Sequence, residues 1–222
     1  MRGVFVTGTD TEVGKSLVSA AICAALAARG DRVAAFKPAV TGIDEDPGEF
    51  GRDHELLAAS ANADQEPEDV AVYRFGPPVS PHLASELSGA AIEPTDLLAA
   101  ARRAGNDALL VCEGVGGLMV PITPGYLVRD LAVDLGLPVV IAARPGLGTI
   151  NHTLLTVEAA RAAGLGVATV VITPWPEEPS ALERSNRQTI ERLSGVPVSG
   201  LPPTTPRDLA EAGTSLPVDD WL

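Results

Sequence analysis

Short apolar runs alternate along the chain with longer amphipathic segments. Five near-continuous apolar runs occupy residues 3–7, 32–37, 108–112, 137–143 and 167–173. Runs without polar alternation are typical of strands that are buried on both faces of a parallel sheet. Residues 196–201 are a candidate sixth strand.

Segments whose apolar residues recur at helical spacing separate these runs. The predicted helices are residues 16–29, 53–61, 95–104, 127–135, 150–163 and 181–193. Several of them are followed by Gly, which commonly ends a helix. The alternation predicts an α/β fold with a doubly wound, mostly parallel sheet and helices on both of its faces.

Two stretches interrupt this alternation. Residues 41–51 are acidic and contain Gly, and residues 75–81 are rich in Pro. Loops of this kind beside an open sheet often cover a ligand. We find no internal repeat and no interdomain linker, so residues 1–222 are predicted to form a single domain. Residues 201–222 are interpreted as a C-terminal arm, either meandering over the surface or frayed.

The net charge and the positions of the cysteines exclude several classes of protein. The chain has 29 acidic and 16 basic residues and a net charge of −13, so long-range repulsion disfavours nucleic acid as a partner. No stretch reaches the ~18 to 20 apolar residues of a membrane span, and the N-terminus lacks the pattern of a signal peptide. We therefore expect no membrane partner and a cytoplasmic location. Cys23 and Cys112 lie in apolar segments without C-x-x-C spacing and are predicted to be reduced core residues.

Lysine is scarce in this chain. Of the 16 basic residues 14 are Arg, and only Lys15 and Lys37 are Lys. An ammonium is a compact point charge, whereas a guanidinium is a wide planar fork. A chain that replaces Lys by Arg elsewhere is expected to keep Lys where a tight anion pocket requires it. The composition therefore indicates a functional role for these two positions.

A glycine-rich segment follows the first predicted strand and opens the first predicted helix. Its sequence from Gly8 to Ser16 is G-T-D-T-E-V-G-K-S. This is the position of a phosphate-binding loop, in which backbone N–H groups and a helix N-terminus hold phosphate oxygens. Lys15 would reach the terminal phosphates, and the Ser16 hydroxyl would bind Mg²⁺. Five residues separate Gly8 from Gly14, one more than is usual, but the fold expected is of the P-loop NTPase type.

Three more charged residues are expected near this loop. Lys37 is placed at the end of the second predicted strand, and Glu113 follows the strand at 108–112 and precedes a run of glycines. The carboxyl ends of parallel strands form the ligand-binding edge of such a sheet. Asp53, just after the acidic loop, either caps a helix or joins Ser16 and Glu113 around Mg²⁺.

The three histidines show no metal-site pattern. His82 and His152 have no second His or Cys at ligand spacing and are interpreted as structural residues that form hydrogen bonds. His54 is predicted to lie on the surface.

Five motifs together make the chain similar to dethiobiotin synthetases. They are the phosphate loop, K-P-A-V-T-G from Lys37, S-P-H-L-A from Ser80, E-G-V-G-G from Glu113 and G-L-G-T-I-N-H from Gly146. The resemblance implies an ATP- and Mg²⁺-dependent ligase of biotin synthesis that converts 7,8-diaminopelargonate and CO₂ into dethiobiotin, ADP and phosphate. It also implies that the reaction passes through a carbamate and a carbamic-phosphoric anhydride, and that the protein is a homodimer. Composition and spacing alone indicate only a site for nucleotide phosphates.

The resemblance also implies roles for individual positions. The nucleotide-binding positions are Glu12, Val13, Gly14, Lys15, Ser16, Leu17, Asp53, Glu113, Gly114, Val115, Gly116, Thr173, Pro174, Leu201, Pro202 and Pro203. The substrate-binding positions are Lys37, Thr41, Gly117, Leu147, Gly148, Thr149 and Asn151. Lys37, Lys15 and Thr11 are the implied catalytic residues, and Ser16, Asp53 and Glu113 are the implied Mg²⁺ ligands. In the family the helix that begins near Gly148 comes from the partner subunit, so the substrate site is expected at a dimer interface.

Three positions depart from the family pattern. Val115 replaces the usual Ala, which adds bulk but removes no chemistry. Thr173 stands where the family often has an Asn that contacts the base, so weak discrimination between bases is predicted. The helix at 181–193 lacks a Tyr that some relatives direct at the substrate carboxylate, and Asn186 or Arg187 is a candidate replacement.

Two other functions fit a phosphate loop in this fold. An amidoligase of the cobyrinate type also activates a carboxyl group by phosphorylation, but it needs a glutaminase domain for which we expect no room in 222 residues. A partitioning or septum-placing ATPase carries an additional Lys early in its phosphate loop. Residues 8–12 contain none, which favours the ligase.

Overall fold

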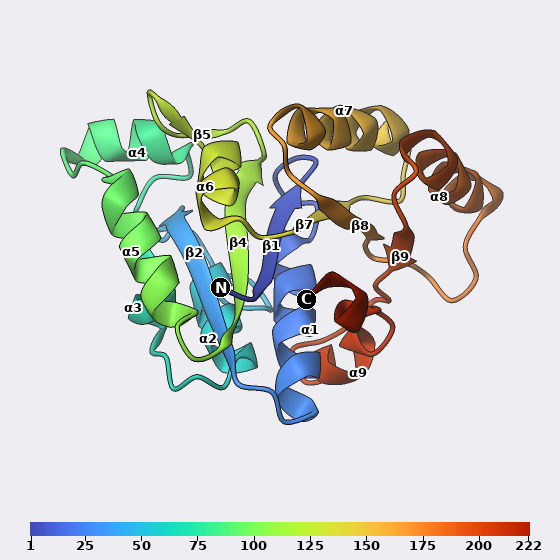
Figure 1. The fold of residues 1–222 in the computed structure, drawn as a ribbon, viewed down its shortest axis with the longest axis horizontal. Coiled ribbons are helices and arrows are strands. Elements are labelled where there is room, and N and C mark those ends of the chain that lie inside the picture. The colour runs from blue at the N-terminus through green and yellow to red at the C-terminus, as the bar shows by residue number, and fades with distance from the viewer.

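Seven parallel strands form the central sheet in the computed structural model, which describes residues 1–222 (Figure 1). Their order across the sheet is β3-β2-β4-β1-β7-β8-β9. The strands are β1 (Gly3–Gly8), β2 (Val33–Thr41), β3 (Ala71–Phe75), β4 (Leu109–Gly117), β7 (Val139–Ala143), β8 (Val167–Ile172) and β9 (Val198–Gly200). A separate antiparallel pair is formed by β5 (Pro121–Thr123) and β6 (Tyr126–Leu127).

Helices cover both faces of this sheet (Figure 1). One face carries α1 (Lys15–Ala28), α2 (Asp53–Ser60), α3 (Pro67–Val70), α9 (Leu209–Gly213) and a 3₁₀ helix (Val218–Trp221). The other face carries α4 (Pro81–Ser88), α5 (Pro94–Ala104), α6 (Val128–Leu135), α7 (Thr149–Ala162) and α8 (Ala181–Ser194). None of these helices has both the length and the apolar composition that crossing a bilayer requires.

The apolar runs are explained by burial on both faces of the sheet. In β1, Val4 and Val6 belong to the core beneath α1, whereas Phe5 belongs to the core beneath α5, α6 and α7, and all three side chains are fully buried. The doubly wound, mostly parallel sheet predicted from the sequence is thereby confirmed. Cys23 and Cys112 are buried and free, as predicted.

The strand predictions missed the short pair β5 and β6 and were incomplete in two further respects. The edge strand β3 was missed because its residues alternate between buried and exposed, with Val72 and Arg74 facing outward. The prediction also ended β2 and β4 too early, since they continue to Thr41 and Gly117. Lys37 therefore lies inside β2 and not at its end. Two short helices, α3 and α4, were also missed, and each begins with a Pro at its first position.

The C-terminal arm is ordered, so its interpretation as a frayed end was wrong. Helix α9 lies along α1 (Figure 1). Gly213 approaches α1 so closely that a Cβ atom there would lie 2.3 Å from the carbonyl oxygen of Ala21. Leu209, Leu216 and Trp221 are buried in the core that α1 shares with the sheet. We propose that the arm folds together with the rest of residues 1–222 as one domain.

Candidate active site

The phosphate loop joins β1 to α1 and has a backbone that only particular residues allow. Gly14 precedes the helix with a φ of +85°, and a Cβ atom there would lie 2.5 Å from Cγ2 of Thr173. Both the left-handed conformation and the close approach require glycine. The Lys15 Nζ folds back over the loop and donates a hydrogen bond to the carbonyl oxygen of Asp10 at 2.7 Å. The ammonium is therefore held at the mouth of the loop.

Lys15 has a perturbed pKa. Burial and, secondly, the nearby charge of Lys37 lower its pKa from 10.5 to about 8. In the unliganded protein Lys15 is thus charged at neutral pH but loses its proton in mildly alkaline solution. A phosphate bound at this position favours the charged form.

ATP affinity should therefore fall as the pH rises. Below about pH 7 Lys15 is already protonated, and binding needs no proton; above about pH 8 binding must take up a proton, so the Kd for ATP should rise about tenfold per pH unit. Isothermal titration calorimetry between about pH 7 and about pH 9 measures this slope, together with the proton uptake. A Kd that stays constant over this interval would contradict the assignment of Lys15 to the phosphates.

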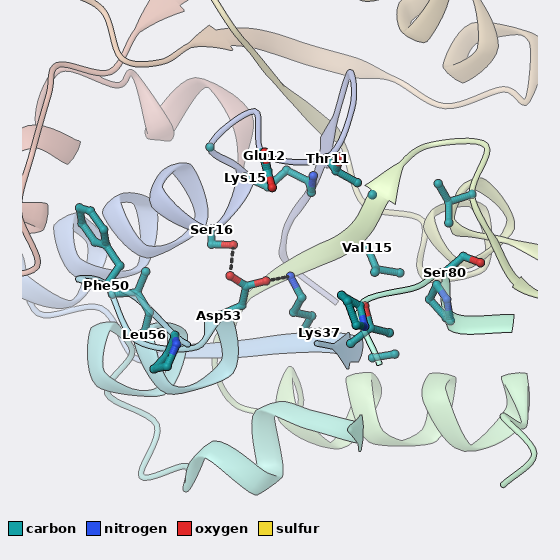
Figure 2. Close-up of a pocket in the computed structure, with 18 of the residues that line it drawn as sticks. Thr11, Glu12, Lys15, Ser16, Lys37, Phe50, Asp53, Leu56, Ser80 and Val115 are labelled. Atoms are coloured by element: carbon teal, nitrogen blue, oxygen red, sulfur yellow. Dashed lines mark hydrogen bonds and ion pairs between the residues drawn. The ribbon is translucent and has the colours of Figure 1, made fainter. Parts of the chain in front are cut away.

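Beneath the loop, the carboxylates of Asp53 and Glu113 connect Ser16 to Lys37. Figure 2 shows the connection through Asp53. The Ser16 hydroxyl donates to Asp53 Oδ1 at 2.7 Å and is placed 2.9 Å from Glu113 Oε1. Lys37 Nζ donates to Asp53 Oδ2 at 2.7 Å and also to Glu113 Oε1. Strand pairing produces this arrangement, because β2 lies beside β4 with Phe36 opposite Cys112.

Lys37 is buried but remains charged. Only 3% of the residue is exposed. Burial alone would lower the pKa of Lys37, but the charges of Asp53 and Glu113 outweigh it and raise the pKa above its ordinary value. The same ammonium is the main reason that the pKa of Asp53 is lowered to about 2. Lys37 and Asp53 are therefore both ionised at neutral pH.

The oxygen atoms in this network suit Mg²⁺. Ser16 supplies a hydroxyl oxygen, and Asp53 and Glu113 supply carboxylate oxygens, which are hard ligands of the kind that Mg²⁺ prefers. Oε2 of Glu113 is buried and has no hydrogen-bond partner. No group of three or more His, Cys, Asp or Glu side chains is arranged so that it could hold a metal ion, so a metal ion here would need phosphate or water oxygens to complete its coordination. The residues fit a metal ion that arrives with a nucleotide.

Both lysines face a single cavity of about 730 Å³ (Figure 2). Predicted site residues that line it are Thr11, Glu12, Gly14, Lys15, Ser16, Leu17, Lys37, Thr41, Asp53, Val115 and Gly116. The two loops that were predicted to cover a ligand, residues 41–51 and 75–81, also line the cavity. The first contributes Pro47 and Phe50, and the second contributes residues 78–81. The composition of these loops indicates a cover for a ligand, but it does not distinguish which of their residues line the cavity.

Comparison with known proteins shows the family to which the chain belongs. A family model described as an AAA domain matches residues 2–207. The ATP-dependent dethiobiotin synthetase of Bacillus subtilis (strain 168) is 38% identical over 204 residues, which cover 91% of this chain and 87% of that protein. The ATP-dependent dethiobiotin synthetase of Anaeromyxobacter dehalogenans (strain 2CP-1) is 42% identical over 217 residues, which cover 97% of this chain and 96% of that protein. The chain belongs to the dethiobiotin synthetase family.

Solved structures with a similar fold include a ParA family ATPase and a cell division protein complex. A ParA family ATPase from Chlorobium tepidum TLS superposes with a TM-score of 0.59 at 14% identity, covering 97% of this chain and 91% of that one. MinC:MinD, a cell division protein complex from Aquifex aeolicus, gives a TM-score of 0.56 at 14% identity, with coverage of 98% and 88%. At this identity the similarity concerns the fold alone, and it confirms the predicted P-loop NTPase type.

The remaining positions implied by membership of the family do not line the cavity. They are Val13, Glu113, Gly114, Gly117, Leu147, Gly148, Thr149, Asn151, Thr173, Pro174, Leu201, Pro202 and Pro203. Glu113 is fully buried beneath the cavity and reaches it through its bonds to Ser16 and Lys37. Thr173 touches the phosphate loop at Gly14, and the following Trp175 donates its backbone N–H to the Leu201 carbonyl at 2.7 Å. The ends of β8 and β9 therefore meet beside the loop.

One prediction about a single residue was wrong. His54 is buried, with 4% exposed, and does not lie on the surface. Asn186 and Arg187, the candidate replacements for the family's tyrosine, are each bonded within the chain. The Asn186 amide donates to the carbonyl oxygens of residues 145 and 146. The Arg187 guanidinium donates to the Val198 carbonyl and lies 5.3 Å from the ring centre of Trp175.

Proposed function

We propose that this protein is an ATP-dependent dethiobiotin synthetase, which forms the cyclic urea of dethiobiotin from 7,8-diaminopelargonate and CO₂ and converts ATP to ADP and phosphate. The observation that carries the proposal is the convergence of Lys15 and Lys37 on one cavity beside a phosphate loop. The names of its relatives support the same activity.

The chemistry explains why two ammonium groups are needed. An amine of the substrate captures CO₂ as a carbamate, whose carbon is a poor electrophile because the negative charge is shared by two oxygens. Transfer of the γ-phosphoryl group to one of these oxygens gives a carbamic-phosphoric anhydride. The neighbouring amine then attacks the carbon, the ring closes and phosphate leaves. Since carbamate and triphosphate are both anionic, positioned positive charge lowers the barrier.

Each ammonium has its own partner in this scheme. Lys15, at the mouth of the phosphate loop, would hold the terminal phosphates, while Lys37 and Thr11 would face the carbamate. Thr41, further along the same wall of the cavity, would bind the diamine. Ser16, Asp53 and Glu113 would hold Mg²⁺, which supplies additional positive charge against the phosphate oxygens.

We also propose a homodimer in which the N-terminus of α7 completes the partner's site. Leu147, Gly148, Thr149 and Asn151 lie outside the cavity of their own chain. Leu147, two residues before α7, is 93% exposed, and Leu155 on α7 is 61% exposed, so this part of the molecule offers apolar side chains to a second copy. The free N–H groups of the helix would bind the far carboxylate of the substrate. The cytoplasmic location stays a prediction.

Mass analysis of the product tests the proposed activity. The protein is incubated with 7,8-diaminopelargonate, bicarbonate and MgATP, and the molecular mass of the organic product is measured by mass spectrometry. We expect a product with the mass of the cyclic urea, formed with an equal amount of ADP and absent when ATP or bicarbonate is left out. Hydrolysis of ATP without any such product would contradict the proposal.

Base selectivity is expected to be weak. Thr173 offers one hydroxyl where an Asn would offer both a donor and an acceptor, so the base edge is read by fewer hydrogen bonds. Competition among ATP, GTP and CTP at equal concentration should give kcat/KM values within about tenfold of one another. A thousandfold preference for ATP would contradict the prediction. The variant Thr173→Asn should increase the preference for ATP.

A further inference from the structure

Asn186 is a buried polar side chain that binds the loop between β7 and α7. It lies on α8 with 4% of its surface exposed. Its Nδ2 atom donates to the carbonyl oxygen of Pro145 at 2.9 Å and to that of Gly146 at 3.1 Å. Both partners are acceptors, so only the amide nitrogen can occupy this position.

The loop that Asn186 holds has little structure of its own. Residues 144–148 are R-P-G-L-G, in which Pro145 has no N–H group and Gly148 has a φ of +91°. The one backbone hydrogen bond that spans the loop is long, from Thr149 N to the Gly146 carbonyl at 3.3 Å. Glycine leaves many conformations open to such a segment. The two bonds from Asn186 therefore select one of them.

The same loop determines where α7 begins. Gly148 is the residue before the first turn of α7, and it is exposed, as is Asn151 within that turn. A second contact, between Arg144 and Asp10 at 3.4 Å, joins the start of the loop to the phosphate loop. Both of those side chains are half-exposed, so this ion pair stabilises the loop little. Asn186 is the stronger restraint because its bonds are buried.

We propose that Asn186 is a positioning residue for the substrate carboxylate: it fixes the loop before α7 and so aims the N–H groups of that helix. The inference rests on the proposed function, in which those N–H groups bind the carboxylate. Because binding at a helix N-terminus depends on the placement of a few N–H groups, a small shift of the loop weakens the binding of substrate without touching the nucleotide site.

The variant Asn186→Leu tests this role, since Leu has a similar volume and cannot donate. We expect the KM for 7,8-diaminopelargonate to rise about tenfold, with kcat and the KM for ATP changed less than about twofold. Ser194→Ala is the matched control. Ser194 is buried at the end of the same helix, but its hydroxyl donates to the Ile190 carbonyl and accepts from the Val196 N–H, and it does not contact the loop before α7. This control should leave the diamine KM unchanged.

A substrate without the carboxylate separates positioning from general damage. The vicinal diamine with the same carbon chain but no carboxylate should give equal KM values in the wild type and in Asn186→Leu. Equal increases for both diamines would overturn the proposal, as would an unchanged KM for diaminopelargonate. If Asn186→Leu does not fold, Asn186→Ala is carried through the same comparison. Failure of the wild type to make the cyclic urea would instead overturn the proposed function, and this inference with it.

Discussion

Replacing Lys37 by Arg is expected to lower kcat by at least about a hundredfold while the Kd for ATP changes only a few-fold. Lys37 is 3% exposed, and its Nζ lies between the carboxylates of Asp53 and Glu113. A guanidinium has the same charge, but its wide planar fork cannot occupy the position of that nitrogen. Steady-state kinetics measures the loss of turnover, and calorimetry measures the retained nucleotide binding.

Arg103→Lys is the matched control for this substitution. It exchanges the same two residue types in the opposite direction at an exposed position on α5. The control should have wild-type kinetics. A Lys37→Arg protein that turns over at close to the wild-type rate would show that a positive charge anywhere near the carboxylates suffices, and the role given to the ammonium would be wrong.

Glu113→Gln is expected to have the second largest effect. The side chain of Glu113 is fully buried. Its Oε1 accepts a hydrogen bond from Lys37 and lies 2.9 Å from the Ser16 hydroxyl, and its Oε2 has no hydrogen-bond partner. The amide keeps the shape but removes the charge that would bind Mg²⁺. We expect kcat to fall by about 10²- to 10³-fold and half-saturation to need at least about tenfold more Mg²⁺.

A Mg²⁺ titration of turnover and of ATP binding checks this second prediction. Glu191→Gln, the same exchange at an exposed position on α8, serves as the control and should behave as the wild type. If Glu113→Gln depends on the Mg²⁺ concentration as the wild type does, the assignment of Glu113 as a Mg²⁺ ligand is wrong. The substitution can also destabilise the fold, because it leaves buried Lys37 with Asp53 as its only acidic partner. Thermal unfolding of the variant measures this loss of stability separately from the loss of Mg²⁺ binding.

The centre of the fold was more predictable from the sequence than its edges. A continuous apolar run such as that of β1 is expected only in a strand whose side chains are buried on both faces of the sheet. By contrast, β3 pairs on one side only and alternates like a surface strand. The C-terminal arm has no strong periodicity, and its order comes from tertiary contacts such as that of Gly213 with α1, which local composition does not encode.

The site was predictable to the extent that local chemistry determines it. The phosphate loop and the scarcity of lysine are local features, and they suffice to indicate Lys15 and Lys37. That Lys37 would be held by Asp53 and Glu113 depends on the register of β2 against β4, which no local pattern gives. The bonds of Asn186, one of two candidate replacements for the family's tyrosine, were not predictable either, because its carbonyl partners lie 40 and 41 residues away in the chain.

Transfer of labelled oxygen from CO₂ to phosphate tests the central claim most directly. If Lys15 and Lys37 serve one reaction in one cavity, an oxygen of the carbamate attacks the γ-phosphorus and leaves with phosphate when the ring closes. Short incubations with C¹⁸O₂ in unlabelled water should therefore release phosphate that carries one ¹⁸O atom for each cyclic urea formed, after correction for exchange between CO₂ and water. Phosphate without label, released while the urea accumulates, would contradict the account.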